Sequence, residues 1–297
     1  MRRFSLVAGA VLGIVTVPAL AAEMEWKKVD AILGRAPAQS GEVHRYAFPR
    51  GDLAVTHDGV TLKPAFALGG WLAFMAMGDG ATVMGDLVLT EAEVNPVMTA
   101  LLANGMEVTA VHNHFLRASP PTFYIHVGGH GDPVKMAETI RAALAMSKTP
   151  LELAPPAAGA PAALDLDTTK LDEAIGVKGR VNGGVYQFGV PRADTVTESG
   201  MAVPAIMGAV NVLNFQPTGG GKAAIAGDII VLGKEVTPLV STLRANGIEV
   251  TAIHNHMLGE EPRTFYVHFW ANDDALKLAA GLREALEKTN VPAKAKM

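Results

Sequence analysis

Cysteine is absent from this chain of 297 residues. Its absence excludes disulfide bonds, thiol nucleophiles and thiolate metal ligands together, so the fold has to be stabilised by burial of apolar side chains. Clusters of basic residues are absent too. The chain has 25 Lys and Arg against 29 Asp and Glu, and its formal net charge is −4. Nucleic-acid binding requires a basic surface, so we expect no nucleic-acid partner.

Long apolar runs are missing everywhere except at the start of the chain. Residues 1–21 resemble a cleavable secretory signal, with Arg2 and Arg3 before an apolar stretch and the small-residue site Ala19-Leu20-Ala21 at its end. A membrane anchor is the alternative for this segment. No later stretch is long and apolar enough to span a bilayer, and without cysteine there is no lipidation site. We therefore expect a soluble mature protein, periplasmic or secreted, with no transmembrane segment.

The chain does contain an internal repeat. Residues 83–127 recur as residues 225–269 without a gap, at a constant offset of 142 (254 − 112 = 142). Self-similarity of this kind indicates a tandem duplication. We expect a signal peptide over 1–21, the first repeat over 22–148, a Pro/Ala-rich linker over 149–167, the second repeat over 168–289 and a tail over 290–297.

The order of expected elements is that of an α+β fold. In the first repeat we expect a short helix at 26–33, strands at 42–48, 53–62, 71–77 and 81–89, a helix after Thr90, strands at 107–114 and 122–127, and a last helix from Asp132-Pro133. Thr90 and Glu93 fit a capping box, and Asp-Pro is a typical helix start. Each repeat should thus form an antiparallel or mixed sheet with helices on one face. A split βαβ, ferredoxin-like arrangement is compatible with this order, and the two repeats would form a pseudo-dimer.

Histidines occupy matched positions in the two repeats. Side chains on a strand alternate between its faces, so the two histidines of each His-Asn-His should share one face, together with the third histidine on the next strand. A hairpin symmetric about residue 119 would pair residue 112 with 126 and residue 114 with 124, and would add a tyrosine to the patch. The six histidines are His112, His114 and His126, and His254, His256 and His268; the tyrosines are Tyr124 and Tyr266.

Three neutral imidazoles on one rigid sheet face are suitable ligands for a divalent transition metal, with an open position for water or another ligand. Zn, Cu, Fe and Mn are the candidate ions. The tyrosines are candidates for binding a small polar ligand. The alternative is structural, with buried histidines that bond to the backbone or to tyrosine.

Other polar residues add further candidates. Glu260 follows His256 and has no counterpart in the first repeat, so a His-x-His-x3-Glu string makes it a candidate catalytic base or metal ligand. Arg50 and Arg192 lie in matched Pro-Arg-x-Asp turns and can bind an anion, although solvated turns are the simpler explanation. The matched residues Asp86 and Asp228 either orient a histidine or bond nearby backbone.

The repeated block His-Asn-His followed by Pro-x-Thr-Phe-Tyr-x-His, preceded by a Gly-Asp-apolar strand, resembles the LppY/LpqO-type family of exported bacterial proteins. The first repeat spells it with Pro120-Pro121-Thr122 and the second with Pro262-Arg263-Thr264. The resemblance implies an exported protein built from two such units and implies no reaction. Lipoprotein members carry a cysteine at the mature N-terminus, and its absence here implies a soluble member.

Three functions are compatible with these observations. The first is an exported protein that binds a transition metal or a small polar ligand in a cleft between the repeats. The second is a metal-dependent hydrolase or dioxygenase with a cupin-like site at His254, His256 and Glu260. The third is a structural or interaction module of the cell envelope with no catalytic role. The sequence leaves the oligomeric state open.

Overall fold

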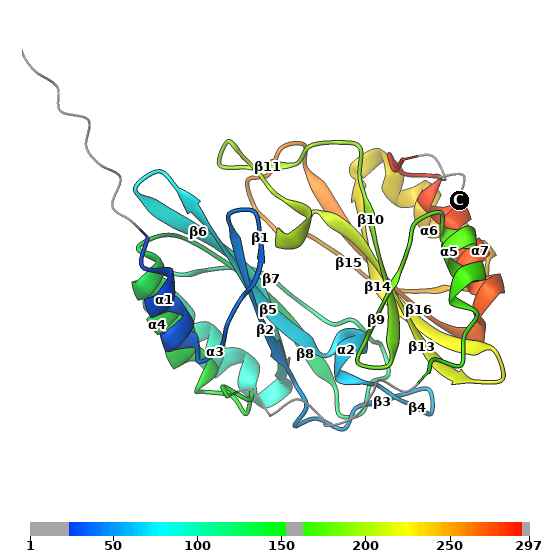
Figure 1. Ribbon diagram of the computed structural model, residues 1–297, viewed down its shortest axis with the longest axis horizontal. Helices are drawn as coiled ribbons and strands as arrows, with labels where there is room; N and C mark the ends of the chain where they lie inside the picture. Colours follow the sequence, from blue (N-terminus) through cyan, green and yellow to red (C-terminus); the bar gives the residue numbers. More distant parts are fainter. Residues whose placement is uncertain (1–23, 153–162, 293–297) are drawn as a thin grey trace, which may run out of the picture.

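The computed structural model describes residues 24–152 and 163–292. The signal peptide expected at 1–21 lies outside these residues. Each repeat contributes one six-stranded antiparallel sheet. Figure 1 shows the two sheets in the middle of the molecule, with the long helices of each repeat on its outer side. The expected α+β architecture with two tandem units is confirmed.

The first repeat has the strand order β1-β2-β5-β6-β8-β7. These strands are β1 (Ala38–Ser40), β2 (Val43–Pro49), β5 (Gly69–Met77), β6 (Gly80–Thr90), β8 (Thr122–Gly131) and β7 (Glu107–His112). The helices α1 (Trp26–Leu33), α3 (Glu91–Leu102) and α4 (Pro133–Leu144) belong to the same repeat.

The second repeat has the equivalent order β15-β16-β14-β13-β10-β9. Its strands are β15 (Glu249–His254), β16 (Thr264–Asp274), β14 (Lys222–Leu232), β13 (Val210–Gly219), β10 (Val185–Pro191) and β9 (Arg180–Asn182). Its helices are α5 (Thr168–Ile175), α6 (Gly233–Ala245) and α7 (Ala275–Leu286).

Local sequence signals set the helix starts. Glu93 accepts a hydrogen bond from the backbone N–H of Thr90 at 2.8 Å, as a capping box requires. Asp132 accepts from the N–H groups of Val134 and Lys135. The strand expected at 53–62 is instead two short strands, β3 (Thr56–His57) and β4 (Val60–Thr61). The chain turns between them because Asp58 and Gly59 adopt positive φ.

The split βαβ unit is present in both repeats. In the first, β6, α3 and β7 follow one another in the chain, and β8 lies between β6 and β7, antiparallel to each. A ferredoxin-like sheet would have its fourth strand after α4. Here the strand beside β6 is β5, which precedes it in the chain.

Each repeat buries a core between its sheet and its helices. In the first repeat, Ile125 and Val127 of β8 pack there with Val97 and Leu101 of α3 and Ile140 of α4. The second repeat has the equivalent core. The opposite face of each sheet is therefore directed toward the other repeat. Val111, on the edge strand β7, is 48% exposed.

The two repeats pack against each other through segments that cross between them. The β3–β4 loop and α2 (Pro64–Ala67) of the first repeat contact the second sheet in one apolar cluster. On the other side, β11 (Thr197–Glu198), β12 (Met201–Ala202) and the 3₁₀ helix η1 (Ala205–Met207) of the second repeat contact the first sheet. Among the helices of residues 24–152 and 163–292, none is long and apolar enough to cross a membrane.

Candidate functional site: a histidine cluster between the repeats

Strand pairing places an aspartate beside a histidine on the inner face of each sheet. Asp86 of β6 is directly opposite His126 of β8. At the matched place in the second repeat, Asp228 of β14 is opposite His268 of β16. Directly opposed residues have Cβ atoms about 4.5–5.5 Å apart. The shared Gly-Asp of the two repeats therefore belongs to the same surface as the histidines.

The hairpin register differs from the expected one. His112 pairs with Tyr124, and Ala110 pairs with His126, so the pairing is shifted by two residues. The strand ends at His112 because the next residue, Asn113, donates its side-chain N–H to the Phe115 carbonyl at 3.1 Å and closes a turn. A shift of two residues keeps every side chain on its face, which is why the expected patch still forms.

A second difference arises in the same strand. The register is interrupted between Val108 and Ala110, as at a β-bulge, which adds one residue to one strand of a pair. Val108 therefore packs against the helix-side core, although simple alternation puts it on the histidine face. The second repeat has the same irregularity between Val250 and Ala252.

The histidines of the two repeats stack on one another across the interface. The ring centroids of His112 and His254, which are matched residues, are 3.6 Å apart. The ring centroids of His114 and His268 are 3.8 Å apart. The equivalent contact with the repeats exchanged, between His256 and His126, is also at 3.8 Å. All six imidazoles thus form one cluster with an approximate two-fold relation.

Two groups of three histidines can hold a metal ion, because their ligand nitrogens lie within 4.8 Å of one another. We call them triad A (His112, His254 and His268) and triad B (His126, His254 and His256). Each triad combines histidines of both repeats. This differs from the expectation that the three histidines of one repeat converge on one point, because the sheets meet face to face and the nearest imidazole neighbours belong to the other repeat.

The ring nitrogens of the cluster are poorly satisfied. Each of the six histidines has at least one buried nitrogen without a hydrogen-bond partner among the described residues. Two rings have a fixed orientation, since Nδ1 of His268 lies 2.7 Å from the Gly227 carbonyl and Nδ1 of His254 lies 3.1 Å from that of Asn255. With Nδ1 donating to these carbonyls, Nε2 of both rings carries the lone pair.

Burial keeps the cluster uncharged. It lowers the pKa of His268 to about 4, although the nearby Asp228 acts in the opposite direction. Burial, with repulsion from neighbouring histidines, also moves the pKa of His112, His114 and His126 far below the usual value. Neutral imidazole is the form that binds metal ions.

The two aspartates lie beside the cluster. Nε2 of His256 is 3.1 Å from the Asp228 carboxylate, and Nε2 of His114 is 4.0 Å from that of Asp86. Burial raises the pKa of both aspartates, and the proximity of Asp228 raises that of Asp86 further. Of the two roles considered for these residues, the geometry favours contact with histidine.

The two tyrosines hold histidines by stacking. The Tyr124 ring lies 3.4 Å from His114, and the Tyr266 ring lies 3.2 Å from His256, centroid to centroid. Both tyrosines are fully buried, and the Tyr124 hydroxyl donates to the Ala67 carbonyl at 2.9 Å. Their position supports a role in orienting the imidazoles.

Arg50 and Arg192 each lie in a buried ion-pair network within their own repeat. The prediction that they lie in solvated turns is therefore wrong. Arg50 is fully buried and donates to Asp52, to Glu93 and to the Val88 carbonyl, each at 2.8 Å. Arg192 makes the same contacts with Asp194, Glu235 and Ile230. Because the terminal nitrogens of both guanidinium groups are occupied within the chain, an anionic ligand would have to displace their partners.

Glu260 is not a member of either triad. Its carboxylate accepts hydrogen bonds from the backbone N–H and the hydroxyl of Thr264, at 3.0 and 3.1 Å. These bonds within the hairpin loop fix the Glu260 side chain. Asp228 is the carboxylate found next to His256, so the His-x-His-x3-Glu arrangement does not assemble as a single group.

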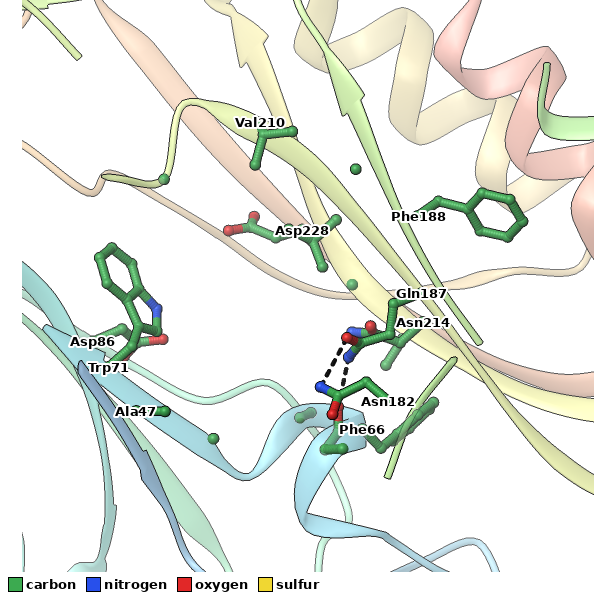
Figure 2. A pocket seen from close by; sticks show the side chains of 18 of the residues that line it. Ala47, Phe66, Trp71, Asp86, Asn182, Gln187, Phe188, Val210, Asn214 and Asp228 are labelled. Atoms are coloured by element: carbon green, nitrogen blue, oxygen red, sulfur yellow. Dashed lines mark hydrogen bonds between the residues drawn. The ribbon is translucent and has the colours of Figure 1, made fainter. Parts of the chain in front are cut away.

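A pocket of about 1070 Å³ lies between the sheets and adjoins the cluster. His114, His126, His256 and His268 line it together with both aspartates, Arg45 and Trp71. Figure 2 shows side chains of both sheets around this pocket, with Asp86 and Trp71 on one side and Asp228 on the other. The pairing of Trp71 with Asp86 is what puts it on the pocket face.

A third group of possible ligands lies apart from the cluster. It consists of His57, Asp58 and Glu249. No sequence pattern indicated this group, because the three residues come from both repeats. Arg117 already bridges the two carboxylates, at 2.8 Å from Asp58 and 2.7 Å from Glu249. This cation makes the group an ion-pair contact between the repeats.

Comparison with known proteins gives one family match. A family model described as Domain of Unknown Function (DUF1259) matches residues 27–146 and again residues 169–288. No curated protein matches the chain.

Two solved structures were also found. A trimeric bacterial microcompartment shell protein, PduB, has 15% identity over 87% of this chain and 96% of its own, with a TM-score of 0.20. EtuB from Clostridium kluyveri has 9% identity over 85% of this chain and 90% of its own, also with a TM-score of 0.20. At such scores these likenesses carry no argument. The family model, in contrast, covers both repeats, and the chain therefore belongs to the DUF1259 family and contains two copies of its domain.

Proposed function

We propose that this protein binds a divalent transition metal ion in the histidine cluster between its repeats. The observation that carries the proposal is the set of six clustered imidazoles, each with at least one buried nitrogen that has no hydrogen-bond partner among the described residues. An unsatisfied buried polar atom costs about 1–3 kcal/mol, so six of them in one place need compensation. A metal ion supplies it by accepting the lone pairs of several rings at once.

The donor chemistry selects the class of metal. Imidazole nitrogen suits Zn, Cu and Fe, whereas Mg and Ca prefer oxygen ligands. Triads A and B share His254, so we expect one ion per chain, held by either triad. The hydrogen bonds of His268 and His254 to backbone carbonyls direct Nε2 toward the ion, as is usual for metal-bound histidine.

Metal content tests the proposal directly. Protein purified from its native compartment, exposed to metal and dialysed should contain about one transition-metal ion per chain by elemental analysis. His254→Ala removes a ligand from both triads and should abolish binding. His130→Ala removes an exposed histidine outside the cluster and should leave binding unchanged. Absence of stoichiometric metal in the wild-type protein would refute the proposal and would favour a purely structural role for the cluster.

A metal-dependent enzyme is a second candidate, favoured by the pocket. His126 and His256 of triad B and His268 of triad A line it, so a small molecule could reach the ion. Asp228, beside His256, takes the place of Glu260 as the candidate base. Turnover of hydrolase or dioxygenase substrates that is lost in Asp228→Asn, with metal content retained, would identify an enzyme. No turnover would leave a binding protein.

We also propose that the protein is exported. The support is the signal-like composition of residues 1–21 and the resemblance to LppY/LpqO-type exported proteins. The test is the mass of the mature protein in cells that express the full chain. Cleavage after Ala21 and recovery from the periplasm or medium are the expected results, and an intact N-terminus in the cytoplasm would contradict them.

A further inference from the structure

The pocket beside the cluster carries a cation, Arg45, that makes no close ion pair. Arg45 stacks over Trp71, with its guanidinium carbon 3.9 Å from the ring centroid, and one of its nitrogens donates to the Ile206 carbonyl of the second repeat. Among the described residues it forms no ion pair within 4.0 Å. Burial lowers the pKa of Arg45 to about 10, although the nearby Asp86 acts in the opposite direction, so the side chain is still charged at neutral pH. A charge in such surroundings favours an anionic partner.

The opposite wall carries an unsatisfied acceptor. Asn214 lines the pocket from β13 and is only 6% exposed. Its Oδ1 is buried without a hydrogen-bond partner in the part of the chain that the structure describes. The neighbouring amide of Gln187 is already occupied, because it accepts from Asn182 and donates to the Ala65 carbonyl. Figure 2 shows these amides together on the second-repeat side of the pocket.

The pocket breaks the symmetry of the duplication. Trp71 pairs with Asp86, and Val212 pairs with Asp228, so Trp71 and Val212 are equivalent. By the same register Arg45, opposite Ala73, is equivalent to Gln187, opposite Asn214. At this pair of equivalent positions one wall therefore supplies a cation on an aromatic ring and the other a neutral amide, while Lys178 and Arg180 line the pocket elsewhere on the second-repeat side. A symmetric ligand-free interface does not need this difference, whereas a ligand bound in one orientation does.

We propose that this pocket binds a small organic carboxylate that also bears a hydroxyl or amino group. The carboxylate pairs with Arg45, the hydroxyl or amino group donates to Oδ1 of Asn214, and the rest of the molecule lies toward the histidines. The volume of about 1070 Å³ is slightly above the usual range for small-molecule sites. The inference deepens the proposed function and rests on it for the contact with metal, whereas the Arg45 contact needs no metal.

Calorimetric titration tests the proposal. The probes are malate, gluconate, glutamate and 4-hydroxyphenylacetate, each with its uncharged amide, and the protein is used with and without metal. At least one acid should bind, and its amide should bind at least about tenfold more weakly, because charge-assisted hydrogen bonds are the strong ones. Failure of all four acids with both forms of the protein would overturn the proposal.

Variants at position 45 assign the contact. Arg45→Gln introduces the residue that the second repeat carries at the equivalent position, and it should weaken acid binding at least about tenfold. Arg45→Lys keeps the charge but cannot form two parallel hydrogen bonds to a carboxylate, so it should give an intermediate loss of affinity for the acid. This variant also replaces Arg45→Gln in the test if that variant does not fold. Lys135→Gln removes the same charge from the exposed side of α4 and should bind like wild type. Equal affinity of wild type and both Arg45 variants would refute the assignment.

Metal content of the same samples separates the two proposals. Arg45→Gln should retain its metal, because Arg45 is not part of either triad. If an acid binds through Arg45 and no metal is found, the metal site fails and the pocket stands. If metal is bound and no acid binds, the pocket proposal fails and the metal site stands.

Discussion

At the scale of single residues, His254 differs from the other histidines of the cluster because it belongs to both triads. His268 belongs only to triad A and His126 only to triad B. The approximate two-fold relation would make His112 and His254 equivalent. The structure nevertheless includes His112 in one triad and His254 in both.

This distribution predicts how histidine variants combine. His126→Ala leaves triad A intact, and His268→Ala leaves triad B intact, so each single variant should still bind about one ion per chain. The double variant should bind none, as His254→Ala does. Elemental analysis after dialysis checks this. Complete loss in either single variant would show that the ion requires histidines of both triads.

Arg50 leads to a prediction about stability. Its replacement by Ala leaves the buried Glu93 without its partner, and breaking a buried ion pair costs about 3–5 kcal/mol. We expect a loss of that size in the free energy of unfolding, measured in urea. Lys135→Ala on the exposed side of α4 should change it by less than about 0.5 kcal/mol. A loss below about 1 kcal/mol for Arg50→Ala would contradict the assigned network.

The histidines also predict the pH dependence of the metal-free protein. Their pKa is lowered in the folded state, to about 4 for His268, so the unfolded chain binds more protons below its own pKa of about 6.5. Stability then falls as the pH decreases from about 6.5 toward 4, and histidine titration does not change it above about 7.5. Urea unfolding of the chelator-treated protein at a series of pH values measures this. Constant stability across that window would contradict burial of the neutral rings.

At the scale of elements, close packing of neighbouring strands explains why a glycine, Gly85 or Gly227, precedes the aspartate in each repeat. A Cβ on Gly227 would lie 1.9 Å from the Val212 carbonyl oxygen, and one on Gly85 would lie 2.6 Å from that of Trp71. Real Cβ atoms do not approach backbone so closely. Only glycine lets the strand run past its neighbour and present the following aspartate to the cluster.

Alanine at this glycine should therefore be destabilising. Gly227→Ala forces the backbone of β13 and β14 apart, and overpacking of this kind costs about 1–3 kcal/mol. Gly51→Ala is the matched control, because its Cβ would meet nothing within 4 Å and its φ is not in the positive range. Thermal unfolding of both variants is the measurement. Equal melting temperatures would show that the strands separate without cost.

Element prediction was most reliable where a local signal acts alone. The helix that follows Thr90 and the helix from Pro133 were expected from capping residues, since a cap depends only on neighbours in the chain. The hairpin register was wrong by two residues because the turn at Asn113 depends on a side-chain bond. The bulge near Thr109 has no sequence signal that alternation could reveal.

At the scale of the whole molecule, the cluster lies where the repeats meet. Thr109 of the first repeat donates to the His256 carbonyl, and Asn255 of the second donates to that of Thr109. The proposed ion would therefore link both repeats. It would stabilise the interface along with the ion pairs of Arg117 and the apolar contacts on either side.

This position predicts that metal raises the stability of the entire chain. Ligand at 100 times its dissociation constant stabilises a protein by about 2.7 kcal/mol. Wild-type protein should thus melt at a higher temperature with metal than after chelation, in a single transition that includes both repeats. His254→Ala should melt at the same temperature in both conditions. A wild-type melting temperature that does not respond to chelation would contradict a bridging ion.

The duplication, the α+β composition of each repeat and the shared histidine face were readable from the sequence, because periodicity and a constant offset of 142 residues are properties of the chain itself. The grouping of His112 with His254 and His268 and the pocket with Arg45 and Asn214 were decided by the tertiary structure alone. These contacts depend on how one sheet is oriented against the other. Packing of residues more than 100 positions apart sets that orientation, and no local pattern encodes it.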